Sequence, residues 1–365
     1  MPEYEGLRRP FRPNGEGLVD NIRMTGTPDR VYNLELFHDA EVRDAIIQRF
    51  DLDDGLNPND PHFERRRFLA FHRFLGFDYI RVGSVGQSWP FHNAGTEDSA
   101  ELSRGQRTYR DEHAGPITTW GEFEQYPWPD PHAPEMMNEV EWWSENLPDD
   151  MCLASLSLGP FCEYLTWLMG YETLCFALYD QRDLVRAIAD RLLEYFGVVN
   201  QRVAEFDRVR IFFPSDDMGF KSATLISPDD TREFVLPGHK MVAEIAHDAG
   251  CPCILHSCGN LNEIIDDLID DCGIDGKHSF EDTIEDVREL KTSGYGRRIA
   301  LLGGIDVDFL CRNDEAAIRK RTRETLDICQ PGGGYCLGTG NSVANYIPLD
   351  HYLAMVDEGR LYGGE

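Results

Sequence analysis

The chain has 365 residues, and 65 acidic side chains against 35 basic ones give it a formal net charge of −30. Nucleic acids are bound by clustered Lys and Arg, whereas the basic residues here are scattered, so the composition argues against a nucleic-acid partner. At this length one large domain or two ordinary ones are possible, and core size is no constraint on folding.

The sequence shows no targeting or membrane segment. No apolar run approaches the roughly 20 residues that a membrane helix needs, and the first residues lack the basic and apolar regions of a signal peptide. We therefore expect a cytoplasmic protein with no membrane partner. The ten cysteines would stay mostly as thiols in that compartment, as buried small side chains, metal ligands or catalysts.

Short apolar runs alternate with amphipathic helical stretches from about residue 30 onward. Eight of these runs are predicted strands, namely 30–37, 79–83, 151–155, 209–215, 252–256, 274–278, 298–303 and 334–338. Helices are predicted between them at 183–206, 227–250 and 313–328. In the second of these, Ser227 is a fitting N-cap and Gly250 supplies a stop. Repeated strand and helix units of this number predict a (β/α)₈ barrel, with a doubly wound open sheet as the alternative.

The prediction is a single barrel domain over residues 1–365, which includes an N-terminal extension at 1–29. Residues 84–150 do not fit the repeat and form a predicted insertion after the second strand, rich in Pro, Gly and aromatic residues. Long loops of this kind are often functional lids. The aromatic side chains Trp89, Phe91, Trp120 and Trp128 either cover the barrel mouth and stack on a ligand or pack the insertion against the barrel.

Metal-binding side chains gather where predicted strands end, which is where barrels carry their active sites. His256 and Cys258 end the fifth strand, and Cys336 lies on the eighth. Two thiolates and one imidazole suit Zn²⁺, and three protein ligands with an open position are typical of a catalytic zinc site. The alternative is that His256 and Cys258 only pack the top of the barrel.

Longer motifs around these residues resemble a known family. The segments are Cys253-Ile-Leu-His256-Ser-Cys258-Gly-Asn260, then Leu302-Gly-Gly-Ile305-Asp306, then Gly333-Gly-Tyr-Cys336-Leu-Gly-Thr-Gly340-Asn341. They resemble the uroporphyrinogen decarboxylase superfamily and, within it, the zinc-dependent relatives of the corrinoid protein:coenzyme M methyltransferases. The resemblance implies a (β/α)₈ barrel with an N-terminal helical extension, and zinc bound by His256, Cys258 and Cys336.

The resemblance also implies a function, which is methyl transfer between a corrinoid protein and a small methyl donor or acceptor. A corrinoid-binding D-x-H-x-x-G motif is absent from the chain, so the corrinoid is expected on a partner protein. The small substrate is either a thiol acceptor or a methoxy or methylamine donor, and the direction of transfer stays open. The sequence does not fix the oligomeric state and allows a homo-oligomer.

A fourth ligand or an acid that acts on the substrate is also expected, and the candidates are Asp216, Asp217, Glu281 and His278. Asp217 is the first choice, because it follows an apolar strand and opens into a loop. The alternative is that one of the two aspartates caps this loop. Glu281 follows the sixth strand by three residues and either reaches the metal or begins the next helix.

Two other functions within the superfamily are possible. A metal-free decarboxylase would hold the carboxylates of a porphyrinogen with an arginine pair after the first strand, but this chain carries Glu35 and Asp39 there. A non-catalytic protein that binds zinc or a corrinoid on the same scaffold is the second alternative.

Overall fold

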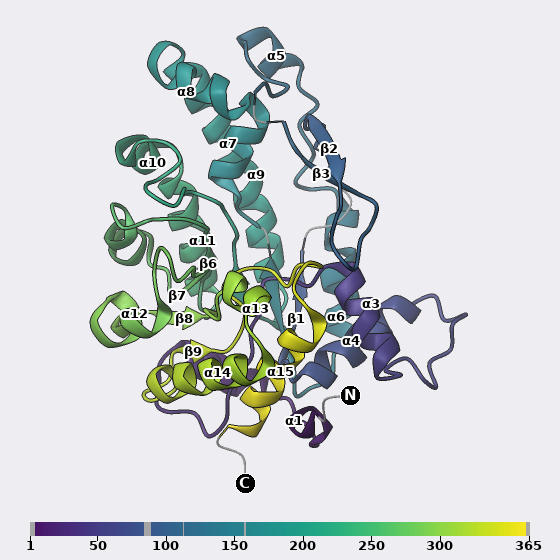
Figure 1. The fold of residues 1–365 in the computed structure, drawn as a ribbon. Helices are drawn as coiled ribbons and strands as arrows, with labels where there is room; N and C mark the ends of the chain where they lie inside the picture. Colours follow the sequence, from purple (N-terminus) through teal and green to yellow (C-terminus); the bar gives the residue numbers. More distant parts are fainter. Residues whose placement is uncertain (1–3, 84–88, 112, 157, 363–365) are drawn as a thin grey trace.

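Seven strands form two parallel sheets in the protein, seen here in a computed structural model that describes residues 4–83, 89–111, 113–156 and 158–362 (Figure 1). The first has the order β1-β4-β5 and the second the order β6-β7-β8-β9. Their bounds are β1 (Tyr79–Val82), β4 (Cys152–Leu156), β5 (Val209–Phe213), β6 (Ile254–His256), β7 (Gly276–His278), β8 (Ala300–Leu302) and β9 (Tyr335–Cys336). All of these ladders are parallel.

Isolated parallel bridges extend this row of strands. Phe212 pairs with Cys253 and Ser215 with His256, which joins β5 to β6, and Asn33 pairs with Leu337 just beyond β9. Strands therefore follow one another in chain order, without the reversal of a doubly wound sheet. In the described part of the chain no ladder joins the segment around Asn33 to β1. The Tyr79 hydroxyl links the two instead, through the backbone nitrogen and oxygen of Glu35 at 3.1 and 2.9 Å.

Seven of the eight predicted strands are confirmed within a few residues. The first prediction, 30–37, is only partly confirmed, because its one bridge residue within that range is Asn33. Its backbone exchanges hydrogen bonds with the chain after β9, such as the one from the Leu34 nitrogen to the Leu337 oxygen at 2.9 Å.

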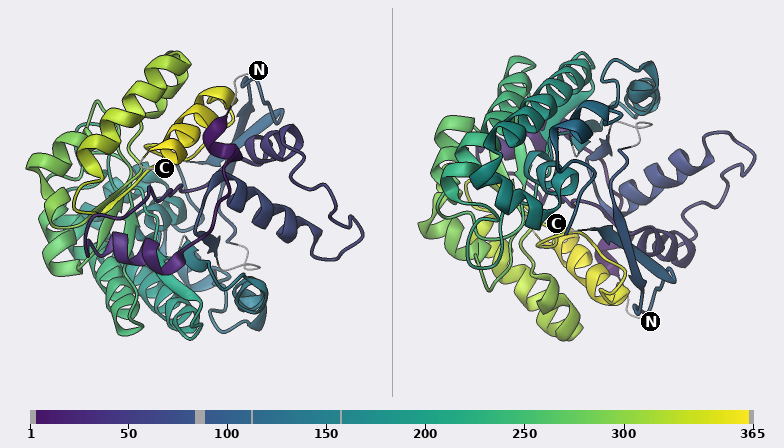
Figure 2. Two further views of the ribbon diagram at one scale, coloured as in Figure 1. Left: turned by 90° about the horizontal axis from the view of Figure 1, so that it is seen from below. Right: turned by 90° about the horizontal axis from the view of Figure 1, so that it is seen from above.

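Helices cover the outer side of the strands, and Figure 2 shows several of them side by side around the sheets. Outside the insertion they are α1 (Glu5–Arg8), α2 (Gly15–Ile22), α3 (Ala40–Arg49), α4 (Phe63–Leu75), α7 (Phe161–Met169), α8 (Tyr171–Asp180), α9 (Arg182–Ala204), α10 (Pro228–Phe234), α11 (Leu236–Asp248), α12 (Val287–Ser293), α13 (Val307–Arg312), α14 (Glu315–Cys329) and α15 (Leu349–Leu361), with shorter helical turns at Asp267–Cys272 and Tyr295–Arg297. The α3 and α4 arm, with the loop between the two helices, projects from the rest of the molecule (Figure 2).

The helix predicted over 227–250 begins where expected, but it is divided into α10 and α11. The Ser227 hydroxyl accepts from the Asp230 backbone nitrogen at 3.1 Å, as an N-cap does. The division at Val235 has a local cause, because Pro237 has no N–H to donate and its ring clashes with the carbonyl one turn earlier.

The insertion has its own structure, although residues 84–88, where it was predicted to begin, lie outside the described residues. It contains the antiparallel hairpin of β2 (Asn93–Glu97) and β3 (Gln106–Arg110), followed by α5 (Trp120–Gln125), a short turn (Pro134–Met137) and α6 (Asn138–Asn146). The Trp89 ring lies 4.8 Å from that of Tyr164 and 5.0 Å from that of Tyr195. The aromatic residues thus mainly pack the insertion against α7 and α9, although Trp120 is 43% exposed.

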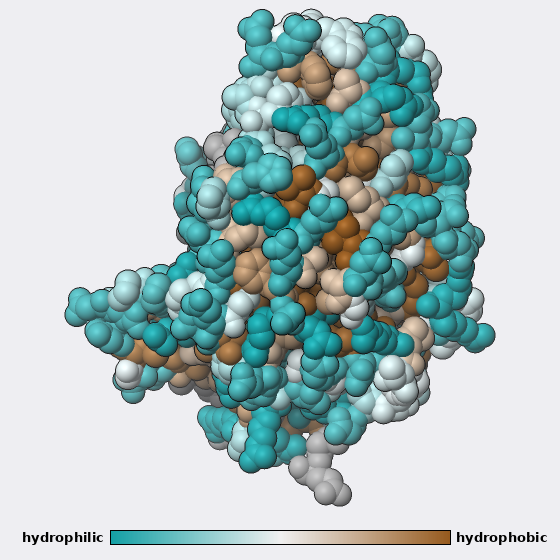
Figure 3. All heavy atoms as spheres, turned by 180° about the vertical axis from the view of Figure 1, so that it is seen from behind, coloured by the Kyte–Doolittle hydropathy of each residue, from teal (hydrophilic) through white to brown (hydrophobic). Residues whose placement is uncertain are grey.

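The surface reflects the acidic composition. Hydrophilic side chains cover most of the face drawn in Figure 3, and hydrophobic ones gather toward its centre. Among the described helices, none combines the length and the apolar composition that a membrane span requires.

Candidate metal centre and its cavity

Two of the three predicted ligands lie together where β6 ends. The Cys258 sulfur is 3.6 Å from the Nε2 atom of His256. His256 is almost fully buried, and Cys258 is partly buried in the loop that follows. His256 is held at the end of β6, and Cys258 follows two positions later. Residues two positions apart in an extended chain point to the same side, so the two side chains meet.

His278 holds the ring of His256 from the neighbouring strand. The two Nδ1 atoms are 2.7 Å apart, and His256 and His278 are paired in the register of β6 and β7. Burial, with the adjacent imidazole second, lowers the pKa of His278 well below its ordinary value, so its ring is neutral. The Nδ1 atom of a neutral His278 can accept a hydrogen bond from the Nδ1–H of His256, which leaves the Nε2 atom of His256 free to bind a metal.

Asp217 completes a group of three side chains whose ligand atoms all lie within 4.8 Å of one another. Its Oδ1 atom is 3.6 Å from the Nε2 atom of His256 and accepts the backbone N–H of Cys258 at 3.1 Å. Desolvation raises the pKa of the Asp217 carboxyl, but its interactions with His256 and Cys258 outweigh this, and the net shift is downward. Asp217 is 46% exposed, so one side of it faces the cavity.

Asp216, the neighbouring residue, has a different task. It is fully buried and accepts the backbone N–H groups of Cys162 and Glu163 at 2.8 Å each, in the first turn of α7. The Nε2 atom of His239 lies 2.9 Å from the same carboxylate. Asp216 therefore satisfies a helix end, and Asp217 is the aspartate at the site.

The thiol of Cys258 has two further polar neighbours. The Nδ2 atom of Asn341 lies 3.2 Å from the sulfur, and the Ser279 hydroxyl lies 4.0 Å away. Burial, followed by the negative charge of Asp217, raises the pKa of the Cys258 thiol well above its ordinary value. A metal ion that binds the Cys258 sulfur would have to displace the thiol proton, because cysteine binds metals as the thiolate.

Cys336, the predicted third ligand, lies elsewhere. It is fully buried in β9, and its sulfur is 3.5 Å from the Nδ2 atom of Asn21 in the N-terminal extension. Asn341, five positions later, is the residue that reaches Cys258. Each extended residue advances the chain by about 3.3 Å, so two positions so far apart do not deliver their side chains to the same point. The ligand group that the structure brings together contains Asp217 in place of Cys336.

Glu281 is not brought to this group either. It is exposed and lines a separate cavity of about 490 Å³ with Asp282 and Asp306. Its backbone oxygen accepts the N–H groups of Ile284 and Glu285 at 2.8 Å, so it begins a helical turn, which was the alternative interpretation of this residue.

Two cavities meet at the group. One of about 380 Å³ is lined by His256, Cys258 and Asn341 together with the aromatic rings of Phe37 and Tyr164. The second, of about 340 Å³, lies toward the β2 and β3 hairpin. They share three lining residues, which are Glu163, Trp167 and Asp217. A small molecule at the metal group would therefore have room on both sides of this shared wall.

Glu163 is a site residue that the sequence did not reveal. It lies on α7 between the two cavities, and burial, followed by the charges of Asp217 and Asp216, raises its pKa to about 9. The sequence offers no signal for it, because Glu163 follows a helix start and not a strand end.

The residues at the first-strand end differ from the cationic anchors of a decarboxylase. Glu35 is buried and accepts from the backbone nitrogen and hydroxyl of Thr339. Burial raises the pKa of Glu35 to about 8. Asp39 forms an ion pair of 2.6 Å with Arg104.

The donor atoms fit a zinc ion. Sulfur and nitrogen ligands at roughly 2.3 and 2.0 Å from one zinc lie roughly 3.5 Å apart at a tetrahedral angle. The observed separation of the Cys258 sulfur and the His256 Nε2 atom is 3.6 Å. Sulfur, imidazole nitrogen and carboxylate oxygen are all ordinary zinc ligands, and the fourth position would face the cavity.

These features define a class of protein, an α/β protein of parallel strands with a candidate metal centre at the strand ends. Residues 111–362 match the Uroporphyrinogen decarboxylase (URO-D) family, so the chain belongs to that family. A methylated-thiol–coenzyme M methyltransferase of Methanosarcina mazei is 33% identical over 137 residues, which are 37% of this chain and 34% of that protein. The similarity to the methyltransferase branch is thereby confirmed.

The fold is also that of a solved structure. A methyltransferase from Methanosarcina mazei superposes with a TM-score of 0.67 at 17% identity, covering 97% of this chain and 100% of that one. At this identity the match concerns the fold alone. The sequence match to the curated relative spans about a third of its length.

Proposed function

We propose that the protein is a zinc-dependent methyltransferase that moves a methyl group between a corrinoid carried by a partner protein and a small substrate. The observation that carries the proposal is the group of His256, Cys258 and Asp217 at the wall of a cavity, in a chain similar to a methyltransferase. The substrate is a thiol that accepts the methyl group, or a methoxy or methylamine compound that donates it.

A zinc ion bound there would lower the pKa of a bound thiol or polarise a bound oxygen. The chain's own residues prepare this site. His278 fixes the ring of His256, and the amide of Asn341 can donate to the sulfur of Cys258. Asp217 can accept a hydrogen bond from a thiol or hydroxyl, or donate one to a departing oxygen when it is protonated.

The fold supports an open mouth above this group. We propose that the row of parallel strands closes as a (β/α)₈ barrel in a single domain, since it runs in chain order from β1 to the segment paired beyond β9. The rim at the carboxyl ends of the strands is where such barrels carry chemistry. In this arrangement the insertion covers part of the mouth, and the partner's corrinoid approaches from the uncovered side.

The test is a methyl-transfer assay with free methylcobalamin in place of the partner. The zinc-loaded protein should demethylate methylcobalamin in the presence of a small thiol: the thiolate sulfur bonds to the methyl carbon, and cobalt keeps the electron pair of the broken bond. Cys258→Ser should lose this activity. If the wild type transfers no methyl group to any thiol, nor from methoxy and methylamine compounds to cob(I)alamin, the proposal is overturned. Formation of coproporphyrinogen from uroporphyrinogen would indicate the decarboxylase alternative.

A further inference from the structure

Lys277 is a buried cation on the strand next to the metal group. It precedes His278 on β7, and only 1% of the residue is exposed. Strands of parallel sheets usually carry apolar residues at such positions, because both of their faces are covered. The Nζ atom of Lys277 pairs instead with Glu285 at 3.2 Å, and the Tyr295 hydroxyl donates to the same carboxylate oxygen at 2.9 Å. The buried charge therefore has a partner of opposite sign.

Stability alone does not account for this ion pair, since well-packed apolar residues in place of a buried pair are often as stable or more so. The other contacts of Lys277 lie on the chain segment that leaves β7. The Nζ atom donates to the backbone oxygen of Ser279 at 2.7 Å and lies 4.4 Å from the centre of the Phe280 ring. Lys277 thus holds the two residues that follow His278.

This segment carries one polar neighbour of the Cys258 sulfur and fixes the other. The Ser279 hydroxyl lies 4.0 Å from the sulfur. The backbone nitrogen of Phe280 donates to the Gly340 oxygen at 3.0 Å, and the next residue, Asn341, places its Nδ2 atom 3.2 Å from the sulfur. The two backbones are in close contact, because a Cβ atom on Gly340 would lie 2.0 Å from the Phe280 oxygen. A shift of Phe280 would therefore also move Asn341.

We infer that Lys277 is a positioning residue of the metal group, which fixes the two hydrogen-bond donors that face the Cys258 sulfur. The inference rests on the zinc site of the proposed function. Hydrogen bonds to a thiolate ligand withdraw electron density from its sulfur, so the metal attracts a further ligand more strongly. A thiol substrate at the open position would then bind with a lower pKa.

The influence of Lys277 on the metal group is indirect. Among the described residues, no hydrogen bond or ion pair joins Lys277 to Asp217, His256 or Cys258. Burial lowers the pKa of Lys277, and the charge of Glu285 opposes this shift. The bond to the Ser279 oxygen needs only an N–H on Nζ, which lysine has in either protonation state.

The test measures metal binding and needs no methyl transfer. Lys277→Met together with Glu285→Gln removes both charges, so neither is left buried without its partner. Cobalt(II) in place of zinc should give the wild type the absorption band of a cobalt–thiolate bond. In the double variant this band should move to longer wavelength, because a thiolate without its donors gives up electron density more readily. Zinc affinity, measured against a chromophoric chelator, should fall about 10- to 100-fold, as for other partners of metal ligands.

Two single variants accompany the double variant. Lys277→Gln is neutral and one atom shorter, and it should shift the cobalt band in the same direction. Lys291→Met is the matched control, since Lys291 also donates to a backbone oxygen, that of Gly333, but lines neither cavity at the metal group. It should keep the band and the zinc affinity of the wild type.

A second background separates positioning from a general loss of structure. In a protein that already carries Ser279→Ala and Asn341→Leu, the two substitutions at Lys277 and Glu285 should change zinc affinity less than about twofold, because the donors through which they act are absent. An equal loss of affinity in both backgrounds, or a cobalt band that neither Lys277 variant moves, overturns the inference.

The inference and the proposed function fail in different ways. If the cobalt band and zinc affinity depend on Lys277 as expected but no methyl group is transferred, the positioning role stands and the proposed function fails. Methyl transfer by a protein whose cobalt band does not depend on Lys277 gives the reverse result. A wild type that binds neither metal at the Cys258 sulfur overturns both.

Discussion

Replacing Cys258 and Cys336 separately by serine should have opposite consequences. The Cys258 sulfur lies 3.6 Å from the His256 Nε2 atom, whereas the Cys336 sulfur contacts Asn21. Structural zinc sites with four ligands bind with about 10–16 kcal/mol, which is roughly 2.5–4 kcal/mol for each ligand. Cys258→Ser should therefore weaken zinc binding roughly 100- to 1,000-fold at a nearly unchanged melting temperature without metal.

Cys336→Ser should keep the zinc and lose stability. Cys336 is fully buried, and a hydroxyl placed there without a good partner costs about 1–3 kcal/mol. The melting temperature should fall by about 1 to 4 °C. Zinc per chain is measured by elemental analysis, zinc affinity by competition with a chromophoric chelator, and melting by circular dichroism. Zinc loss in Cys336→Ser, with zinc retained in Cys258→Ser, would refute the ligand assignment.

Three further changes test the surroundings of the site. Asp217→Asn should lower the rate of methyl transfer about a hundredfold or more with little change in melting temperature. Asp216→Asn should instead lower the melting temperature, because the Asp216 carboxylate accepts the backbone N–H groups at the start of α7. An Asp217→Asn variant that is destabilised but keeps its activity would contradict this difference in roles. His278→Leu should weaken zinc binding about 10- to 100-fold in the chelator assay, since it removes the partner of the His256 ring, and an unchanged affinity would show that the ring needs no support. The pKa of Glu35 is raised to about 8, so between its ordinary value of 4.5 and pH 8 the folded chain binds more protons than the unfolded one and stability falls as pH rises, by up to roughly 5 kcal/mol. Glu35→Gln should remove most of this fall in urea unfolding at pH 5 and pH 8, and an equal fall in both proteins would place the titration elsewhere.

The strand order could be predicted from the sequence because each parallel strand is a short apolar run between helices with clear ends. Ser227 and Gly250 mark such ends well, and Pro237 is the sequence signal for the break at Val235, which the prediction of one continuous helix did not take into account. Residues 30–37 resemble a strand, yet their only bridge within that range is at Asn33.

The site could be predicted only in part. His256 and Cys258 are only two positions apart at a strand end, so the contact between their side chains follows from local geometry. Which residue becomes the third member of the group depends on how far the chain extends beyond β5 and β9. The spacing of residues in the sequence does not determine this distance. Thus the sequence predicts Asp217 on the substrate or as a fourth ligand and Cys336 at the metal, whereas the structure gathers Asp217 with His256 and Cys258 and brings Asn341 to the sulfur of Cys258.

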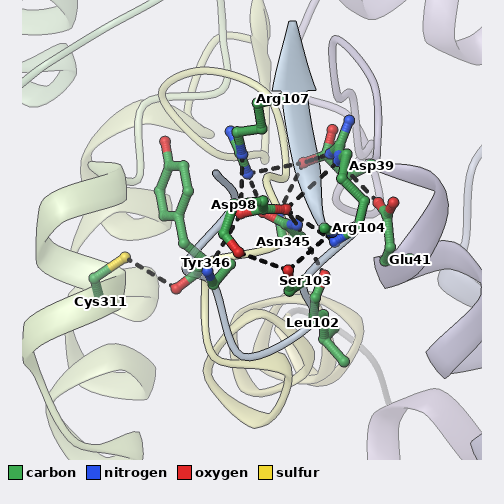
Figure 4. A network of polar contacts seen from close by, with 12 residues as sticks. Asp39, Glu41, Asp98, Leu102, Ser103, Arg104, Arg107, Cys311, Asn345 and Tyr346 are labelled. Carbon is green, nitrogen blue, oxygen red and sulfur yellow. Dashed lines mark hydrogen bonds and ion pairs between the residues drawn. The ribbon is translucent and has the colours of Figure 1, made fainter. Parts of the chain in front are cut away.

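The β2 and β3 hairpin pairs with itself, whereas the parallel strands pair across long stretches of sequence. Its main polar attachment is the small network around Asp98 and Asn345 (Figure 4). Substitutions along the hairpin can therefore alter what the neighbouring cavity admits without touching the parallel strands or the metal group. The hairpin is therefore the segment to alter in protein engineering when the contents of the cavity are to change while folding and metal binding are preserved.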